Sequence, residues 1–519
     1  MTEQTGWKQE QTERKQMLLY EKLMQYGDSD HYPYHMPGHK RRKLGAMPEQ
    51  ILRTDITEID GFDNLHEARG ILREAQDVVN ALYGAEETWF LVNGSTCGIL
   101  SAVSAALPDK GHLLITRSSH KSVYHAAYLR QLRLSYLYPE INEEFGFSEA
   151  VTPGLVQEAL NRESDIGAVL IVSPTYEGRI ADVAQIAEVV HAKGIPLIVD
   201  EAHGAHLGFA EGFAESSCTT GADLVIHSVH KTLPAMTQTA LLHVNGKLID
   251  RDRLRRFLRI YQTSSPSYVL MASICDAMEI MEKDAANYFA AFRVQYIQMT
   301  ERLQTCRVLS FVPQEDMVCG RQDIGKLVIG VKGGQRGQWL YDVLREKYHL
   351  QCEMAAGTYC LAMFTVADGA EAYDRMARAL LEIDDELVRQ DELAGRDVLA
   401  GQGALAGQEV LAGRNALDRQ NIIAEQDVKA GIVAEGAKSR YPFCEAWDMS
   451  WRLQRFSDAV GCAVAEFVNL YPPGTPILVP GEVLTEKLYW QILSYQEQNL
   501  NLQGLEKKEG EYYIRVLEN

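Results

Sequence analysis

The sequence predicts an α/β fold, in which a mainly parallel sheet carries helices on both faces and is joined to a smaller C-terminal α+β domain. Two observations support this prediction. Between about residues 55 and 270, short apolar runs alternate with helical patterns, as expected when crossover helices connect parallel strands. Beyond residue 267 the pattern is helical to about residue 303 and then mixed, which indicates a separate, smaller unit.

The strands of the large domain are expected at its apolar runs. These runs cover residues 88–92, 112–115, 167–172, 195–199 and 223–226. The carboxyl ends of parallel strands form the crevice in which such sheets bind ligands. Residues that directly follow these runs are therefore the first candidates for chemistry.

The chain divides into four predicted parts. Residues 1–50 are polar and turn-rich and form an N-terminal arm, and residues 51–270 form the large domain. Residues 271–390 and 435–519 together form the smaller α+β region. Residues 391–434 form a low-complexity insertion within that region.

The insertion contains a short repeat. The triplet Leu-Ala-Gly begins at Leu393, Leu399, Leu405 and Leu411, a strict period of six residues. A β-helix needs more turns than this to bury a core, so the array predicts a poorly ordered insertion. A short helix or a contact surface are the alternatives.

Composition limits the classes of partner and compartment. The 519 residues carry a formal net charge of −20, which disfavours binding to nucleic acid or to anionic membranes. The nine cysteines are scattered without a CxxC pair, as in proteins that keep reduced thiols in the cytosol. The N-terminus is polar, and no apolar run approaches the roughly 18 residues of a membrane span. We therefore expect a soluble cytoplasmic protein.

Two residues at predicted strand ends point to a cofactor. Asp200 directly follows one apolar run, and Lys231 lies shortly after another. A lysine amine can hold an aldehyde as an imine, and a carboxylate can keep a pyridine nitrogen protonated, which are the two groups that pyridoxal phosphate requires. The protonated ring stabilises the carbanion formed when a bond at Cα breaks. Asp200 alone would be a structural acid; with Lys231 it predicts pyridoxal phosphate.

Phosphate contacts are expected near two further strand ends. Ser95 and Thr96 stand where a helix begins, and the backbone N–H groups of a helix N-terminus bind phosphate readily. A capped helix with a glycine turn is the simpler interpretation of that segment on its own. Ser228 and His230 precede Lys231 and are either further phosphate contacts or turn residues.

The histidines near strand ends have alternative interpretations. His120 follows the run 112–115 and is either a structural residue or a ring that stacks on the pyridine. His203 and His206 form a pair without a third ligand or a general-base motif. We therefore predict no metal site.

Several ordered segments resemble the ornithine/lysine/arginine decarboxylase family. They are residues 36–40, 60–66, 90–96, 119–122, 173–178, 200–204, 228–232, 262–268 and 471–476. The resemblance covers nearly the whole chain outside the Leu-Ala-Gly array. As a set these motifs are highly specific.

The resemblance implies a fold-type-I, aspartate-aminotransferase-like enzyme that uses pyridoxal phosphate to remove the α-carboxylate of a basic amino acid, in polyamine biosynthesis. Lys231 would hold the cofactor, Asp200 would bind the pyridine nitrogen and His120 would stack on the ring. The other implied cofactor contacts are Ser95, Thr96, Ser228 and His230 around the phosphate, with His203 nearby.

The resemblance also implies assembly. Family members are at least dimers with active sites at the subunit interface, so Ser265 would reach the partner's cofactor. The chain is expected to be the short form, without the N-terminal response-regulator-like domain of the larger acid-inducible relatives.

The resemblance leaves three basic amino acids as candidate substrates. Arginine, giving agmatine, is favoured over lysine, giving cadaverine, and over ornithine, giving putrescine. The acid at the far end of the pocket would decide, and Glu482 is the candidate. An aminotransferase or another lyase on the same fold is one alternative, and a catalytically silent protein that binds partners is another.

Overall fold

A seven-stranded sheet forms the centre of the large domain. The computed structural model describes residues 19–332, 337–401, 438–471 and 474–518. The sheet strands are β1 (Glu87–Leu91), β2 (His112–Thr116), β3 (Arg133–Leu137), β4 (Ala168–Val172), β5 (Leu197–Asp200), β6 (Leu224–His227) and β7 (Ala240–Val244). Their order is β1-β7-β6-β5-β4-β2-β3, and only β7 runs antiparallel to its neighbours. The predicted mainly parallel sheet is confirmed.

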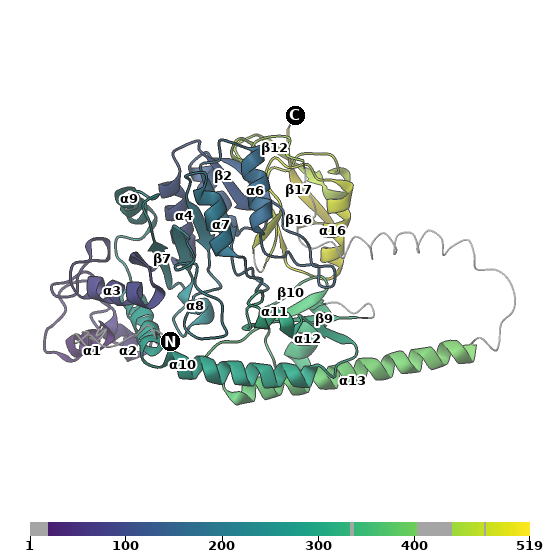
Figure 1. Cartoon of the computed structure of the whole chain (residues 1–519), viewed down its shortest axis with the longest axis horizontal. Helices are drawn as coiled ribbons and strands as arrows, with labels where there is room; N and C mark the ends of the chain where they lie inside the picture. The colour runs from purple at the N-terminus through teal and green to yellow at the C-terminus, as the bar shows by residue number, and fades with distance from the viewer. Residues whose placement is uncertain (1–18, 333–336, 402–437, 472–473, 519) are drawn as a thin grey trace, which may run out of the picture.

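Alternate residues of each strand pack on opposite faces of this sheet. Leu114 belongs to one apolar core and its neighbours Leu113 and Ile115 to the other, as the two-residue period of a strand requires. On one face lie α4 (Gly94–Ala106), α5 (Lys121–Leu129) and α9 (Arg251–Tyr261). On the other face lie α3 (Ile71–Tyr83), α6 (Pro153–Arg162), α7 (Val183–His191) and α10 (Tyr268–Leu303). The sheet is thus buried on both sides (Figure 1).

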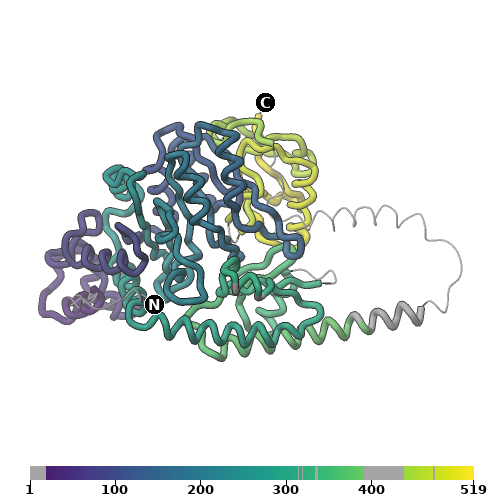
Figure 2. The backbone as a smooth tube through the Cα atoms, viewed as in Figure 1, coloured from purple at the N-terminus to yellow at the C-terminus, as the bar shows by residue number. Residues whose placement is uncertain are grey.

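The N-terminal segment packs beside the large domain. It contains α1 (Leu19–Asp28), α2 (Glu49–Thr54) and the short helix η1 (Leu65–Glu67), and both α1 and α2 contact α10. Helix α10 occupies the span that the sequence predicts as helical. It runs alongside α13 (Ala370–Gly401), and together the two form the long edge seen in Figure 2.

Helix α13 extends into the predicted insertion. It takes in the first two Leu-Ala-Gly copies, at Leu393 and Leu399, so residue 391 is not the end of an element. The copies at Leu405 and Leu411 lie outside the described residues. Within the part of the chain that the structure describes, no helix is long and apolar enough to cross a membrane.

The C-terminal region contains two units, the first of which shares an apolar core with the large domain, while the second has a core of its own. The first is a four-stranded antiparallel sheet, order β10-β11-β9-β8, which packs with α12 and α13. Its elements are β8 (Leu309–Phe311), α11 (Gln314–Val318), β9 (Lys326–Val331), α12 (Gly337–Tyr348), β10 (Met354–Ala355) and β11 (Tyr359–Met363).

The second unit is built from two three-stranded sheets around its own apolar cluster, which includes Val468, Ile492 and Ile514. Its elements are α15 (Phe443–Ala446), β12 (Trp451–Arg455), η2 (Phe456–Asp458), β13 (Val468–Leu470), β14 (Thr475–Leu478), α16 (Glu486–Glu497), β15 (Leu502–Gln503), β16 (Glu506–Lys508) and β17 (Glu511–Leu517). This yellow unit lies against the large domain in Figure 1.

Candidate functional site

A cavity of about 550 Å³ lies at the carboxyl ends of the central strands and the N-terminus of α4. It brings together every predicted site residue except Ser265 and Glu482. Those that line it are Ser95, Thr96, His120, Asp200, His203, Ser228, His230 and Lys231. Ser265 is exposed in the segment between α9 and α10 and does not line this cavity.

The aspartate and the lysine come from neighbouring parallel strands. Asp200 is the last residue of β5 and pairs in register with Ile226 of β6. Strand β6 ends one residue later, and Ser228 then caps the short helix α8 (Val229–Thr232), which carries Lys231. Both side chains therefore stand at the same edge of the sheet because parallel strands end there together.

Burial acts on this pair in opposite directions. It raises the pKa of the Asp200 carboxyl, while the nearby Lys231 charge and the Ala202 N–H, which donates to Oδ1 at 3.2 Å, lower that pKa. Burial lowers the pKa of Lys231, and the carboxylates of Asp200 and Glu353 partly oppose this. The lowered pKa favours the neutral amine, which is the nucleophilic form of a lysine.

His203 lies between two lysines. Its Nε2 is 3.1 Å from Lys231 Nζ, and its Nδ1 is 2.8 Å from Nζ of Lys326. The Tyr176 ring packs edge-on against the imidazole at 4.7 Å between centroids. Burial and the two lysine charges hold the pKa of His203 well below its ordinary value, so the ring is neutral. No motif in the sequence analysis pointed to Lys326.

At the end of the cavity predicted to bind phosphate, one buried hydroxyl has no hydrogen-bond partner in the described part of the chain. Ser228 is fully buried, and its Oγ has no hydrogen-bond partner among the described residues. An orphaned buried hydroxyl is costly unless something binds it. Gly94 begins α4 at a φ of +73°, which favours glycine, and directs the helix N-terminus with Ser95 and Thr96 toward the cavity. These groups fit a phosphate.

His230 is less suited to that role than predicted. Its Nδ1 lies 2.8 Å from the carbonyl oxygen of Thr239, and because a carbonyl only accepts, Nδ1 carries the hydrogen. Burial lowers the pKa of His230, so the ring is mainly neutral and Nε2 is an acceptor. A direct contact of Nε2 with phosphate requires the protonated ring.

His120 combines the structural and the functional interpretations. It caps α5, and its Nδ1 accepts a hydrogen bond from the Ser122 N–H at 3.2 Å. Burial, with lesser effects from Lys231 and Lys121, lowers the pKa of His120 to about 3. The cap orients a neutral aromatic ring that lines the cavity, as a ring that stacks on a pyridine would need.

The placement of Glu482 is corrected by the structure. Its carboxylate accepts from Arg117 at 2.9 Å and from the Val479 N–H at 2.9 Å, both acid and guanidinium are buried, and Glu482 does not line the cavity. Besides Asp200, the carboxylate of Glu353 lines the cavity, and its charge also raises the pKa of Lys231. The hydroxyl of Tyr176 donates to Glu353, whose side chain is otherwise exposed.

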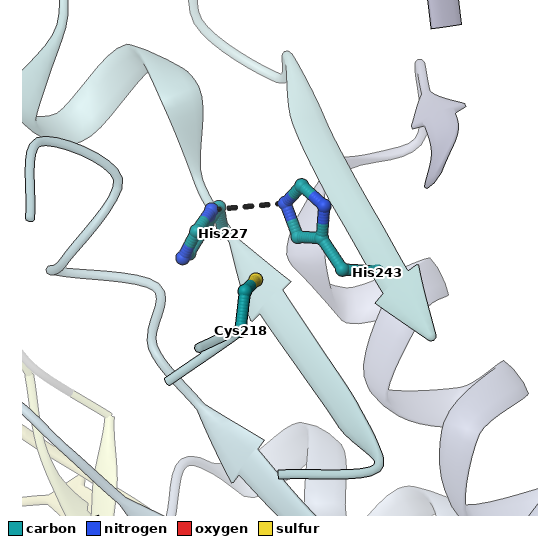
Figure 3. Close-up of side chains that lie close together, drawn as sticks. All are labelled: Cys218, His227 and His243. Atoms are coloured by element: carbon teal, nitrogen blue, oxygen red, sulfur yellow. Dashed lines mark hydrogen bonds between the residues drawn. The ribbon is translucent and has the colours of Figure 1, made fainter. Parts of the chain in front are cut away.

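A buried cluster of Cys218, His227 on β6 and His243 on β7 has the residue types of a metal site (Figure 3). Its ring nitrogens are already engaged: His227 Nδ1 meets His243 Nε2 at 3.0 Å, and His227 Nε2 meets Glu201 at 2.8 Å. His243 Nδ1 meets Thr88 Oγ1 at 2.8 Å, and burial raises the pKa of the Cys218 thiol. We interpret the cluster as a hydrogen-bond network.

The chain is similar to known decarboxylases. A model of the Orn/Lys/Arg decarboxylase family, major domain, matches residues 18–331. The arginine decarboxylase of Bacillus subtilis (strain 168) is 29% identical over 499 residues, which cover 94% of this chain and 95% of that protein. The arginine decarboxylase of Bacillus anthracis is 28% identical over 516 residues, 94% of each chain.

A solved structure has the same fold. The lysine decarboxylase of Francisella novicida superposes with a TM-score of 0.78 at 17% identity, and the match covers 97% of this chain and 81% of that one. The constitutive lysine decarboxylase of Escherichia coli gives 0.77 at 18% identity, covering 96% and 82%.

Proposed function

The chain belongs to the Orn/Lys/Arg decarboxylase family, and we propose that it decarboxylates arginine to agmatine with pyridoxal phosphate held by Lys231. Family membership makes it a decarboxylase of a basic amino acid, in agreement with the sequence prediction. The identity of the substrate, the residues that hold the cofactor and the assembly belong to the proposal.

One observation carries the proposal. Asp200 and Lys231, at the ends of neighbouring parallel strands, line a single cavity together with Ser228, whose buried Oγ lacks a partner among the described residues. Pyridoxal phosphate needs three groups from a protein: an amine for its aldehyde, a carboxylate for its pyridine nitrogen and hydrogen-bond donors for its phosphate. Their convergence supports the cofactor more strongly than any one of them.

The chain's residues would divide the work as follows. When bound, pyridoxal phosphate accepts the electron pair left at Cα as the carboxylate departs. The Asp200 carboxylate would keep the pyridine nitrogen protonated, and the neutral amine of Lys231 would bond to the aldehyde carbon. The uncharged His120 ring would cover one face of the pyridine. Ser95, Thr96 and Ser228 would donate to the phosphate.

Substrate binding is proposed to use Glu353. It is exposed toward the cavity, and its carboxylate can receive the positive head group of the substrate while Tyr176 orients it. The relatives named arginine decarboxylase match over nearly the full length of both chains, which favours the guanidinium of arginine over the shorter amines.

Assembly and location complete the proposal. We propose a cytoplasmic homodimer in which the exposed Ser265 of one subunit lies near the cofactor of its partner. The exposure of Ser265 and its separation from its own chain's cavity support this arrangement.

The proposal is tested with purified protein and pyridoxal phosphate. CO2 release and amine product are measured with arginine, lysine and ornithine separately, and Lys231→Ala is the control. We expect agmatine from arginine and no imine absorbance in the control. A rate with lysine or ornithine at least about tenfold above that with arginine overturns the substrate assignment.

The same samples test the alternative reaction and the identity of the cofactor-binding lysine. A keto-acid product would indicate transamination. Borohydride reduction followed by peptide mapping identifies the lysine that held the cofactor, and a label on any lysine other than Lys231 overturns its proposed role.

A further inference from the structure

A second buried lysine stands directly behind the candidate site. Lys326 begins β9, is only 1% exposed and does not line the cavity. Its Nζ lies 2.8 Å from His203 Nδ1, and the opposite ring nitrogen is 3.1 Å from Lys231 Nζ. A single imidazole therefore bridges two lysine amines, one from the large domain and one from the small sheet.

Hydrogen-bond chemistry restricts the charges of this chain of three groups. The neutral ring of His203 has one N–H and one nitrogen that accepts. An ammonium only donates, so it can bond well to the accepting nitrogen alone. The amine that faces the ring N–H must offer a lone pair and so must be neutral. Two ammonium groups on the neutral ring would leave one donor facing another.

We propose that Lys326 is a positioning residue that shares one positive charge with Lys231 through His203, so that Lys231 becomes neutral when Lys326 takes the proton. This inference rests on the proposed role of Lys231 as the amine that holds the cofactor. Lys326 would act on the reaction only through His203, because it does not reach the cavity.

The proton movement balances without any other reactant. An ammonium hydrogen of Lys231 passes to His203 Nε2 as the Nδ1 hydrogen passes to Nζ of Lys326. The charge moves from one lysine to the other, and the ring changes tautomer. Lys231 is left with a lone pair for the aldehyde carbon, and the reverse movement returns its proton.

The surroundings of Lys326 allow it to hold or release that charge. Burial and the charge of Lys231 together lower its pKa to about 8, while nearby carboxylates oppose the shift. The titratable groups that face it are Asp323, Glu177, Glu353, His203 and Lys231. An amine that titrates near neutral pH suits a proton relay better than one fixed in either form.

A glycine leaves room for the base of the Lys326 side chain. The Lys326 side chain packs on Gly178, where an added Cβ would come within 2.7 Å of Lys326 Cγ and 2.9 Å of its Cβ. Gly178 also has a φ of +95°, which disfavours other residues. This close packing restricts the base of the side chain whose Nζ lies 2.8 Å from His203 Nδ1.

The test measures the pH dependence of imine formation by cofactor-free protein after mixing with pyridoxal phosphate. Lys326→Met removes the second charge, so the pH midpoint should rise by about one unit. Lys326→Arg keeps a permanent charge that always donates to His203 Nδ1, so the midpoint should fall. The matched control is Lys332→Met, because Lys332 is exposed just beyond the other end of β9. Its midpoint should equal that of the wild type.

The outcomes separate this inference from the proposed function. Circular dichroism establishes that each variant folds, and if Lys326→Arg does not fold, Lys326→Met decides alone. An unmoved midpoint in Lys326→Met, with borohydride still labelling Lys231, overturns the shared charge and leaves the proposed function intact. A label on another lysine overturns the role of Lys231 and this inference with it. A raised midpoint with Lys231 labelled supports both.

Discussion

Two pairs of ionisable residues inside this protein are stabilised in different ways. Arg117 and Glu482 form an ion pair at 2.9 Å, and the guanidinium also donates to the carbonyl of Pro476 at 2.8 Å. Lys231 and Lys326 instead face each other across His203, with two amines competing for one neutral ring. The first arrangement joins opposite charges, whereas the second joins two amines that we propose share a single positive charge.

The difference indicates that the Arg117–Glu482 pair serves structure and that the lysine pair serves chemistry. Arg117 follows β2 of the large domain and Glu482 follows β14 of the C-terminal unit, so their pair ties the two units together. The two lysines repel each other whenever both are protonated. This repulsion makes one of them lose its proton more easily. Strongly perturbed groups of this kind cluster at functional sites.

Breaking the ion pair should have the largest effect on stability. Arg117→Met leaves Glu482 buried without its partner and should lower the free energy of unfolding by about 3–5 kcal/mol. Urea unfolding followed by fluorescence measures this. The double variant Arg117→Met, Glu482→Leu removes both charges and should recover much of the loss. A single variant as stable as the wild type would contradict the structural role of the pair.

The Arg117–Glu482 pair stabilises the fold, whereas a protonated Lys326 should destabilise it, and the pH dependence of stability should show this. Burial lowers its pKa from 10.5 to about 8. Between these pH values the unfolded chain binds more protons at this site than the folded chain does, so stability rises with pH across the interval. The shift corresponds to an effect on the order of 3 kcal/mol.

Lys326→Met lacks this contribution. Its stability relative to the wild type should therefore be greatest near pH 8 and should decline as the pH approaches 10.5. Urea midpoints of the two cofactor-free proteins across this range measure the trend, with Lys332→Met as the reference for a lost exposed charge. Parallel curves for Lys326→Met and wild type would show that Lys326 has no lowered pKa.

Removing the Asp200 carboxylate, which stabilises the charged form of Lys231, should test the electrostatics of the lysine pair directly. The Asp200 carboxylate raises the pKa of Lys231, so Asp200→Asn should move the midpoint of imine formation to lower pH. Decarboxylation should nevertheless fall by more than about a hundredfold, because the amide cannot keep the pyridine nitrogen protonated. Stopped-flow absorbance and CO2 release measure the two effects separately. A midpoint that rises would contradict the assigned electrostatics.

The candidate site was predictable where chemistry follows local spacing. Asp200 and Lys231 each lie just after an apolar run, and parallel strands bring such positions to one edge. Lys326 was missed because it begins a strand of another sheet and reaches the site only through His203. Glu482 was misplaced because its partner Arg117 is 365 residues away in the sequence, and no local pattern indicates such a pairing.

The fold shows the same limit. Strands β1, β2, β4, β5 and β6 were predicted within one or two residues at most boundaries, because their apolar runs are buried on both faces. Strand β3 was missed because it lies at the edge of the sheet and four of its five residues are not fully buried, so it lacks a continuous apolar run. Strand β7 was missed as well, although all five of its residues are buried, so burial alone does not decide which strands the sequence reveals.

The smallest predicted effect concerns a charge that faces the substrate. Glu353→Gln keeps an oxygen that can accept from Tyr176 but loses the negative charge that lines the cavity. If Glu353 binds the substrate's head group equally in the ground and transition states, KM for arginine should rise about tenfold with little change in kcat.

The matched control is Glu346→Gln, which removes an exposed acid paired with Arg345 on α12. Its KM should equal that of the wild type. An unchanged KM in Glu353→Gln would mean that Glu353 acts on Lys231 rather than on the substrate, since its charge raises the lysine pKa. In that case the midpoint of imine formation should fall, and the acid would belong with Asp200 among the groups that balance the two lysines.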